Sequence, residues 1–460
     1  MNKKKKITLL IISFLLVALL IPTETKKKVF RLLPNQIENS LKKKVKSLFF
    51  SFPLNMQYVV KILFHDPSSW KHKGYPSSIE IFNNDYNVKF LPETQTLKLK
   101  FIKKYINIDS KIKDEKKTKN PYSGSNIGRV RAIDIYNKDT LIVPIGKNQF
   151  AYHKIDLEII NSDKTLLFKE IKSNFKGSNI LDSHISSETI FISHVNKKNN
   201  CSYMNVSSSN INLKKMNFQT LMASEECSKQ NVYGGRIKNF NHKNKEGILL
   251  TTSEVKMNEP TNNAQYDDSI FGKILFIDTI SKKIINYSKG HRNPQGLYVD
   301  NDLILSTEHG PQGGDEINKI SFENNYGWPL ASYGTRYNKK RNNENNIEAN
   351  KELKFYNSHE ENSFIEPIYS FLPSIGISEM IKIPNSFSKK WKDNFLISSL
   401  NDRSLYRVKF SKDFNKILYM EKIYVGSRIR DIKFDAKNNM FILLFHDPYS
   451  TELGFLINEN

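Results

Sequence analysis

The segment EHGPQGGDEIN, from Glu308 to Asn318, combines three acidic side chains with three glycines. The apolar run LILSTE that leads into it predicts a strand, so the segment is expected to leave the edge of a sheet as a loop. Glycines let backbone carbonyls turn inward, and Asp315 and Glu316 add carboxylates. Oxygen ligands of both kinds suit calcium, which accepts irregular coordination. The spacing is not that of an EF-hand, so a solvated glycine-rich turn is the alternative on these residues alone.

Short apolar runs separated by turn residues fill the chain from about residue 124 onward. They are DTLIVPIG, ETIFISHV, EGILLTT, GKILFID, DLILSTE, DNFLISSL and NMFILLF. Almost no helical periodicity lies between them, which predicts an all-β fold. Sandwich, barrel and propeller architectures all fit such a pattern. The 337 residues after position 123 exceed one sandwich, and blades of roughly 40–50 residues would number about six, so we expect a six-bladed β-propeller.

The N-terminal region differs in charge and hydropathy. Residues 1–123 carry 25 Lys and Arg against 9 Asp and Glu, which is +16 of the formal net charge of +23. The uncharged run Ile7–Ile21 between two lysine clusters predicts a signal anchor at residues 1–25, with a cleaved signal peptide as the alternative. The excess lysines beside it suit anionic lipid headgroups better than nucleic acid. We expect an inner-membrane anchor facing the periplasm in the cell envelope, or a secreted form after cleavage.

A charged run that begins at Asp109 reads as a solvated linker. It divides a basic extension of mixed structure, residues 26–123, from the expected propeller, residues 124–460. Two cysteines, Cys201 and Cys227, lack a metal-ligand spacing such as C-x-x-C. In an oxidising compartment they could pair, and a disulfide and two buried thiols are equally compatible with the sequence.

Three uncommon motifs occur in order and close together: GHRNPQGLYVD from Gly290, the acidic loop, and NNYGWPLASYG from Asn324. This triplet resembles the glucose/sorbosone dehydrogenase family, whose members are soluble aldose sugar dehydrogenases that use pyrroloquinoline quinone (PQQ) on a six-bladed β-propeller. Weaker matches are NVYGGRI from Asn231, PSIGISEM from Pro373 and GSRIRDIKFD from Gly426. The resemblance covers about residues 126–460.

The resemblance implies a cofactor site built from arginines and amides. The matching positions are Arg292, Asn293, Arg428 and Arg430. PQQ is a tricarboxylated ortho-quinone, and guanidinium forks hold carboxylates at defined angles. A late position where the family usually has lysine is Asn401 here, and we expect Arg403, two residues on along an extended strand, to restore the charge.

The same resemblance implies two calcium sites and a dimer interface near the acidic loop, so calcium and a homodimer are expected. The carbonyls of Gly310 and Pro311 would face the calcium beside the cofactor. Asp315, Glu316 and Tyr326 would lie at the second, structural calcium.

One departure from the family concerns the general base. In the family a histidine in the register H-x-x-G-R removes the hydroxyl proton while a hydride leaves the anomeric carbon, and this register places Val232 at that position. Loss of such a base costs on the order of 10²–10⁴ in rate. His242 and His291 are expected to be surface or packing histidines, so no catalytic residue is identified.

Two function classes therefore stay open. One is a PQQ- and calcium-dependent aldose dehydrogenase that passes electrons to an external acceptor. The other is a noncatalytic calcium-binding propeller that binds a carbohydrate or a protein, because a shared fold does not fix the function.

Overall fold

The computed structural model describes residues 77–80, 97, 99–109, 130–146, 148–255, 262–335, 359–446 and 452–458. All of these belong to the second of two compact units, Gly74–Asn460. The predicted signal anchor and most of the basic extension lie outside the described residues. None of the helices in the described ranges has the length and apolar character needed to cross a membrane.

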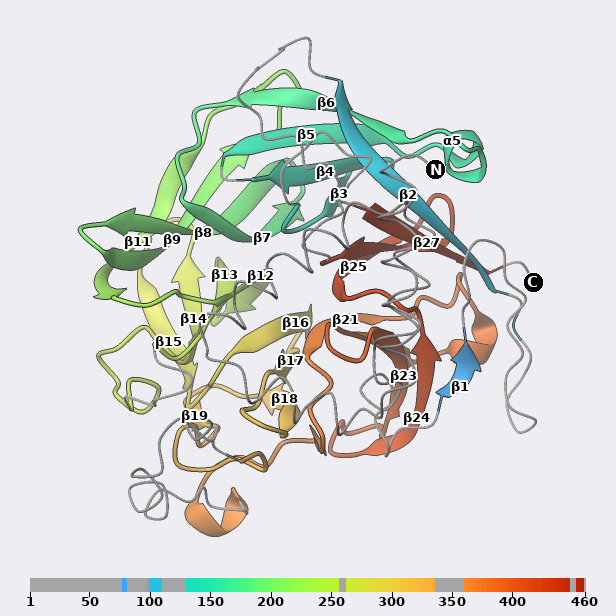
Figure 1. Cartoon of the computed structure of the whole chain (residues 1–460). Helices are drawn as coiled ribbons and strands as arrows, with labels where there is room; N and C mark the ends of the chain where they lie inside the picture. Colours follow the sequence, from blue (N-terminus) through green and yellow to red (C-terminus); the bar gives the residue numbers. More distant parts are fainter. Residues whose placement is uncertain are drawn as a thin grey trace, which may run out of the picture. The chain divides into compact units, whose positions relative to one another are not determined.

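Within the described residues, antiparallel strands build six four-stranded blades around a central axis (Figure 1). From the innermost strand outward, the first blade consists of β3 (Asp134–Tyr136), β4 (Thr140–Ile145), β5 (Gln149–Lys154) and β6 (Leu166–Ser173), and the second of β7 (Asn179–Ser186), β8 (Thr189–Lys198), β9 (Cys201–Asn210) and β11 (Gln219–Ser228). The third blade consists of β12 (Gly234–His242), β13 (Lys245–Thr252), β14 (Lys273–Asp278) and β15 (Ile284–Lys289), and the fourth of β16 (Pro294–Asp300), β17 (Leu303–Glu308), β18 (Asp315–Ile320) and β20 (Tyr369–Phe371). The fifth blade consists of β21 (Ile377–Lys382), β22 (Asn394–Ser399), β23 (Ser404–Phe410) and β24 (Ile417–Tyr424), and the sixth of β25 (Ile429–Asp435), β26 (Met440–Phe445), β27 (Glu452–Asn458) and β2 (Leu99–Asp109). The remaining elements are β1 (Ser77–Glu80), β10 (Lys215–Met216), β19 (Asn324–Asn325), α5 (Leu157–Asn161) and the 3₁₀ turns Glu360–Asn362 and Lys389–Trp391.

The innermost strands close a ring. Each lies against the next in the order β3, β7, β12, β16, β21 and β25, and β25 returns to β3. The all-β propeller expected from the sequence is therefore confirmed, and every apolar run quoted above coincides with a strand.

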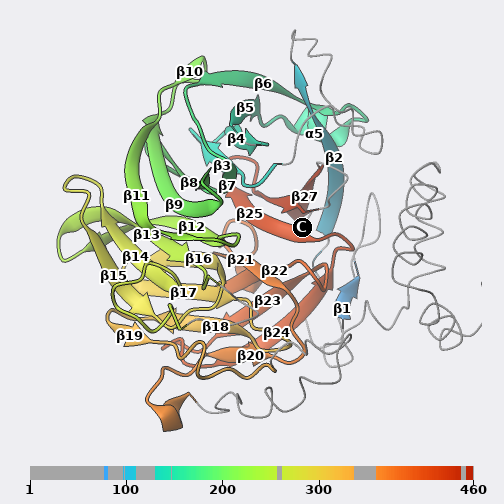
Figure 2. The same cartoon turned by 60° about the vertical axis from the view of Figure 1, so that its left-hand side comes forward.

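The last blade takes its outer strand from the N-terminal side of the chain. Residues 99–105 of β2 pair antiparallel with β27, and Ile106–Asp109 then pair parallel with β6 of the first blade (Figure 2). Leu99 and Phe101 are buried in the same apolar cluster as Phe441. The propeller thus extends upstream of the boundary expected at residue 123, because residues 99–109, which end where the charged run begins, form a blade strand.

The middle strands explain the continuous apolar runs of the sequence. Every residue of β4, β14, β22 and β26 is buried. Both faces of these strands are therefore shielded from solvent, which is why apolar residues fill most of their positions on both faces.

Aspartates on the inner strands join one blade to the next. The Asp134 carboxylate accepts the backbone N–H of Ile185 (2.7 Å), and Asp182 accepts that of Ile237 (3.1 Å). Asp431 accepts that of Ile133 (3.2 Å) and so bridges the last blade to the first. Buried backbone amides at the blade junctions are satisfied in this way.

The strand order divides the loops between two ends of the propeller. Because neighbouring strands are antiparallel, each link between blades lies at the same end as the hairpin between the second and third strands of a blade. We call this end the arginine end. Its loops include residues 229–233, 290–293, 309–314, 400–403 and 425–428. Hairpins between first and second strands lie at the opposite end.

Candidate functional site

All six residues expected to bind the cofactor lie at the arginine end. Arg292 and Asn293 form the link between β15 and β16, and Arg428 and Arg430 lie at the start of β25. Asn401 and Arg403 lie in the turn between β22 and β23.

Gln295 links two of these residues, Asn293 and Arg430, which belong to different blades. The Arg430 guanidinium donates a hydrogen bond to Gln295 Oε1, and Gln295 Nε2 donates to Asn293 Oδ1 (2.7 Å). Asn293 Nδ2 in turn lies 3.4 Å from His309 Nδ1. Burial lowers the pKa of His309, and the positive charges of Arg430 and Arg292 lower it further against the opposing effect of Asp315. Arg292, Asn293 and Arg430 therefore converge around His309 and Gln295, neither of which the sequence had indicated.

The acidic residue at the start of the loop fixes the link that carries Arg292. The Glu308 carboxylate accepts the backbone N–H groups of Arg292 and Asn293, and it also contacts His291 Nδ1 at 3.0 Å. Arg292 donates to the carbonyl of His309 (2.9 Å), and its guanidinium lies 5.3 Å from the centre of the Trp328 ring. The side chain of Arg292 is therefore held on two sides, and Glu308 orients its backbone.

Another arginine, Arg236, supports this array and is only 2% exposed. It forms ion pairs with Asp182 (3.1 Å), Glu379 (3.3 Å) and Asp431 (3.6 Å). Burial alone would lower the pKa of Arg236, but these carboxylates raise it above its ordinary value. Charge and hydrogen bonds to three inner strands therefore fix this guanidinium.

Arg236 also supports the residues above it. Its Nε donates to the carbonyl of Gln295 (2.6 Å), and one terminal nitrogen donates to the carbonyl of Arg430 (2.7 Å). The backbone positions of Gln295 and Arg430, whose side chains are hydrogen-bonded to each other, thus depend on one buried side chain.

The prediction that Asn401 and Arg403 lie on an extended strand is wrong. Residues 400–403 form a turn, Arg403 has a left-handed backbone (φ 55°), and its carbonyl accepts the N–H groups of Val425 and Gly426 at 3.0 Å. Asp402 fixes the turn, because its carboxylate accepts from the Tyr406 hydroxyl (2.5 Å) and from Lys422. Alternation along a strand therefore does not relate residues 401 and 403.

Val232 is buried, with 2% of its surface exposed, in an apolar cluster that includes Leu181, Ile237 and Phe271.

His242 lies among aromatic rings, with the centre of its ring 4.7 Å from that of Phe322. His291 is held between Ser288 (2.9 Å) and Glu308. Both histidines therefore have packing roles, as expected.

The acidic loop is shaped by close backbone approaches. A Cβ atom at Gly310 would collide with the carbonyl oxygens of Gly313 and Gly314, so only glycine fits there. Asp315 accepts the backbone N–H of Gly310 (3.0 Å) and that of Ile377 (2.9 Å). The carbonyl oxygens of Gly313 and Gly314 therefore lie close to Gly310, and the Asp315 carboxylate holds the backbone.

Glu316 lies in a buried acidic neighbourhood. Burial raises its pKa well above the ordinary value, and Glu308, Asp315 and Glu366 raise it further. Tyr326 uses its hydroxyl to donate to the carbonyl of Lys319 (2.6 Å) and to accept the N–H of Ser321 (2.9 Å). In the described part of the chain, no three His, Cys, Asp or Glu side chains converge as a metal site.

A cavity of about 720 Å³ opens at the same end beside Val232. Its walls include Tyr233, Asn231 and Cys201, and Cys201 forms a disulfide with Cys227 that joins β9 to β11. Val255 also lines it, and the adjacent Glu254 donates its backbone N–H to the carbonyl of Arg292 (2.8 Å). One backbone hydrogen bond, from the residue that precedes Val255, therefore connects the wall of the cavity to the link that carries Arg292.

The profile of the glucose/sorbosone dehydrogenase family matches residues 177–450, more than half of the chain. The chain therefore belongs to this family, which confirms the resemblance. It is 28% identical over 247 residues to aldose sugar dehydrogenase YliI of Escherichia coli (strain K12), a match that covers 50% of this chain and 60% of that protein.

A shorter match, 53% identical over 49 residues, links it to quinoprotein glucose dehydrogenase B of Acinetobacter calcoaceticus and covers 10% of each chain. The chain matches three fifths or less of the length of these curated relatives. The crystal structure of the soluble aldose sugar dehydrogenase from Escherichia coli in the apo-form shares the fold, with a TM-score of 0.57 and 19% identity over 72% of this chain and 96% of that chain.

Proposed function

We propose that this protein is a PQQ- and calcium-dependent sugar dehydrogenase of the cell envelope. The observation that carries the proposal is the array of Arg292, Asn293, Gln295 and Arg430 around His309 at the arginine end. Fixed guanidinium and amide donors in one place suit a ligand with several carboxylates and quinone oxygens.

The donor set fits PQQ. Arg292 and Arg430 would bind carboxylates, Asn293 would donate from its amide, and Arg428 lies at the rim of the same end. When bound, PQQ supplies a quinone that accepts a hydride from a sugar carbon. The protein's own contribution is to hold the ligand through groups that are already oriented, which lowers the entropic cost of binding.

The acidic loop supports the calcium part of the proposal. The carbonyls of Gly310 and Pro311 are candidates for the site beside the cofactor, and Asp315, Glu316 and Tyr326 for the structural site. A divalent cation near Glu316 would relieve the repulsion among the buried carboxylates that raises its pKa. The Tyr326 hydroxyl already donates one hydrogen bond and accepts another. At Tyr326 the backbone carbonyl is therefore the better calcium ligand.

The cavity beside Tyr233 is the proposed sugar entrance. Asn231 and Tyr233, on either side of Val232 in the sequence, line it, and its wall residue Val255 follows Glu254, which donates to the carbonyl of Arg292. Electrons would pass to an external acceptor. An exported location agrees with the Cys201–Cys227 disulfide, since such bonds persist in oxidising compartments. Anchoring through residues 1–25, membrane contact through the basic extension and a homodimer remain part of this proposal.

Val232 favours a second function, a noncatalytic propeller. A buried valine in an apolar cluster has no proton to exchange and leaves no polar group at the position of the expected base. Such a protein would keep the fold and calcium and would bind a carbohydrate or a protein at the same cavity.

The deciding experiment is a titration of the full-length protein with PQQ in the presence of calcium, followed by an aldose panel with an artificial electron acceptor. The dehydrogenase predicts saturable PQQ binding and turnover, and Arg430→Ala should weaken binding about tenfold or more. Binding without turnover would favour the noncatalytic propeller. An absence of PQQ binding would sink the dehydrogenase proposal.

A further inference from the structure

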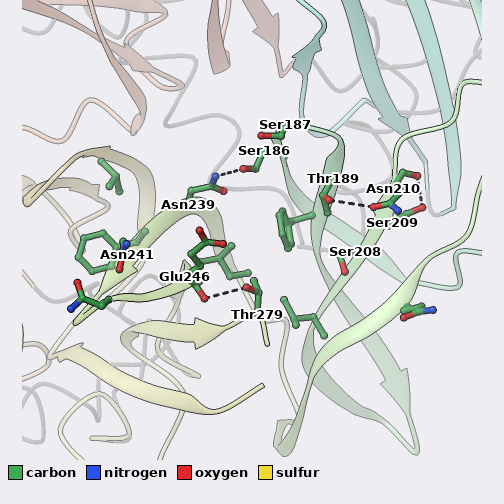
Figure 3. A pocket seen from close by; sticks show the side chains of 18 of the residues that line it. Ser186, Ser187, Thr189, Ser208, Ser209, Asn210, Asn239, Asn241, Glu246 and Thr279 are labelled. Atoms are coloured by element: carbon green, nitrogen blue, oxygen red, sulfur yellow. Dashed lines mark hydrogen bonds between the residues drawn. The ribbon is translucent and has the colours of Figure 1, made fainter. Parts of the chain in front are cut away.

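A wide groove lies at the opposite end of the propeller, between the second and third blades (Figure 3). Its volume is about 1520 Å³, and residues of the β7–β8, β12–β13 and β16–β17 hairpins and of the end of β9 line it. We call it the polar groove. Thr189 and Asn210 lie on one side of it, and Asn239 and Asn241 on the other.

The polar groove is lined mainly by uncharged polar side chains. Fourteen of its twenty-five lining residues are Ser, Thr, Asn or Gln, and seven of those are asparagines. Hydroxyl and amide groups both donate and accept hydrogen bonds, so they complement a ligand whose own groups do both. Sugar hydroxyls have this property, whereas carboxylates and phosphates only accept.

The charges around the polar groove nearly cancel. Lys215 and Lys243 stand against Glu246, Asp300 and Asp302, which leaves a formal charge of −1. The chain as a whole is strongly basic, so this groove differs from the rest of the molecule. Such a balance disfavours a polyanion, since binding to phosphates or uronates depends on an excess of cations.

The floor of the polar groove adds apolar surface. The rings of Phe191 and Phe240 are 8% and 9% exposed, and Leu221 is 8% exposed. Small apolar areas among polar groups suit the C–H faces of sugar rings, which combine both characters. The groove also exceeds the roughly 300–1,000 Å³ of a typical small-molecule pocket, so a chain of several sugar units fits its size better than one monosaccharide.

Several lining side chains are held in place by neighbours. Asn239 donates to Ser186 Oγ and lies 3.0 Å from His184 Nε2 through its Oδ1. Thr279 donates to the carbonyl of Glu246 (3.1 Å), and Thr189 donates to Asn210 Oδ1 (3.4 Å). Side chains that are already ordered lose less conformational entropy when a ligand binds.

We propose that the polar groove binds a neutral oligosaccharide, as a carbohydrate-binding site separate from the arginine end. Strand topology places the two sites at opposite ends of the blades, so the groove would retain the protein on a neutral glycan without occupying the cavity beside Tyr233. This site does not depend on PQQ, calcium or turnover. It would operate equally in an active dehydrogenase and in a noncatalytic propeller.

The test is calorimetry of the full-length protein, without PQQ, against neutral pentasaccharides with glucose, xylose and mannose backbones. Polygalacturonate and heparin serve as anionic probes. The proposal predicts saturable binding of at least one neutral pentasaccharide, with weaker or no binding of both polyanions at physiological salt. The proposal would be overturned if no neutral pentasaccharide bound detectably, or if a polyanion bound more tightly than the neutral probes.

Variants assign the binding to the polar groove. Asn217→Ala and Asn241→Ala change exposed lining residues, and each should weaken binding about fivefold, with about 25-fold for the pair. Ser208→Phe adds bulk inside the groove and provides a second route that removes no amide. Gln230→Ala, an exposed amide in the cavity at the arginine end, is the matched control and should leave affinity unchanged.

Equal melting temperatures would show that the variants are folded. If Gln230→Ala weakened binding while the groove variants did not, the oligosaccharide would bind at the arginine end and the proposal would be wrong. Capture of a protein partner that the groove variants abolish, without any glycan binding, would contradict it as well.

Discussion

At the arginine end the polar side chains are buried and bonded to one another, whereas at the opposite end they line an open groove. Arg236 and Gln295 are each 2% exposed, and their hydrogen bonds run to other blades. Asn239 and Asn241 are exposed to solvent, although Asn239 also bonds to Ser186 of the neighbouring blade. The first arrangement suits one charged ligand in a fixed pose, and the second suits uncharged ligands that can vary.

The largest effect is expected for Arg236→Met. The substitution removes the guanidinium that pairs with Asp182, Glu379 and Asp431, and loss of one partner from such a buried group typically costs about 3–5 kcal/mol. Lys433 at 3.8 Å from Asp431 and Lys238 at 3.9 Å from Glu379 are the cations that remain. Urea unfolding of the full-length protein measures the change. Lys409→Met, at an exposed lysine of β23, is the control and should change stability little. Equal stability of the two variants would contradict the idea that the arginine end is held by its buried charges.

A pH dependence follows from His194 in β8. Burial lowers its pKa from 6.5 to about 4, against the opposing effect of Asn196. The unfolded chain therefore binds this proton first as the pH falls, so stability is lost from about pH 6.5 down to about pH 4, by about 3 kcal/mol. His184, whose pKa is also lowered, contributes with the same sign.

Unfolding curves between pH 7 and pH 4 measure this loss. His194→Gln should flatten the dependence, and parallel curves for the two proteins would contradict the prediction. No histidine is among the residues that line the polar groove. Glycan affinity should accordingly stay constant from pH 7 to pH 5.5 while stability declines, which separates the groove from the body of the propeller.

A smaller effect is expected for Gln295→Met, which keeps the side-chain volume but removes the link between Asn293 and Arg430. If PQQ binds there, its affinity should fall about tenfold, which corresponds to about 1.4 kcal/mol. Quenching of protein fluorescence by PQQ in the presence of calcium provides the measurement. Gln230→Met is the control at the same end, and an equal fall for both variants would mean that the array around His309 does not hold the cofactor.

The smallest effect is expected for Arg403→Ala. Arg403 lies in a turn, not in a strand, and its backbone is left-handed. Hydrogen bonds to its backbone carbonyl hold it in this position. PQQ affinity should change less than twofold in the same titration. A loss as large as that of Gln295→Met would instead show that Arg403 supplies the charge that lysine provides elsewhere in the family.

Much of the architecture was predictable from the sequence, because strands buried on both faces leave unbroken apolar runs such as residues 274–277 and 440–445. The family motifs also located Arg292, Asn293 and Arg430 at one site. Both signals are local: each consists of a few adjacent residues whose types are constrained by one strand or one loop.

The supporting residues could not be predicted in the same way. Arg236 contacts Asp182, Glu379 and Asp431 on three other strands, and no local pattern encodes such pairs. Gln295 has an ordinary place in the GHRNPQG motif, and only the ring of blades brings it to Arg430. Arg403 was misplaced because a turn stabilised by the buried Asp402 interrupts what reads as a continuous strand.

The closure of the ring by β2 and β27 has a consequence for the order of folding. Leu99 pairs with Asn458, so the last blade joins segments from the two sides of the whole propeller sequence. Contacts at such separations carry the largest loop-closure entropy and form late. During synthesis the first five blades can assemble before residues 99–105 of β2 have β27 to pair with. The last blade is complete only when β27 has emerged from the ribosome. A chain that begins after residue 123 would lack β2 and could not close the ring in this way.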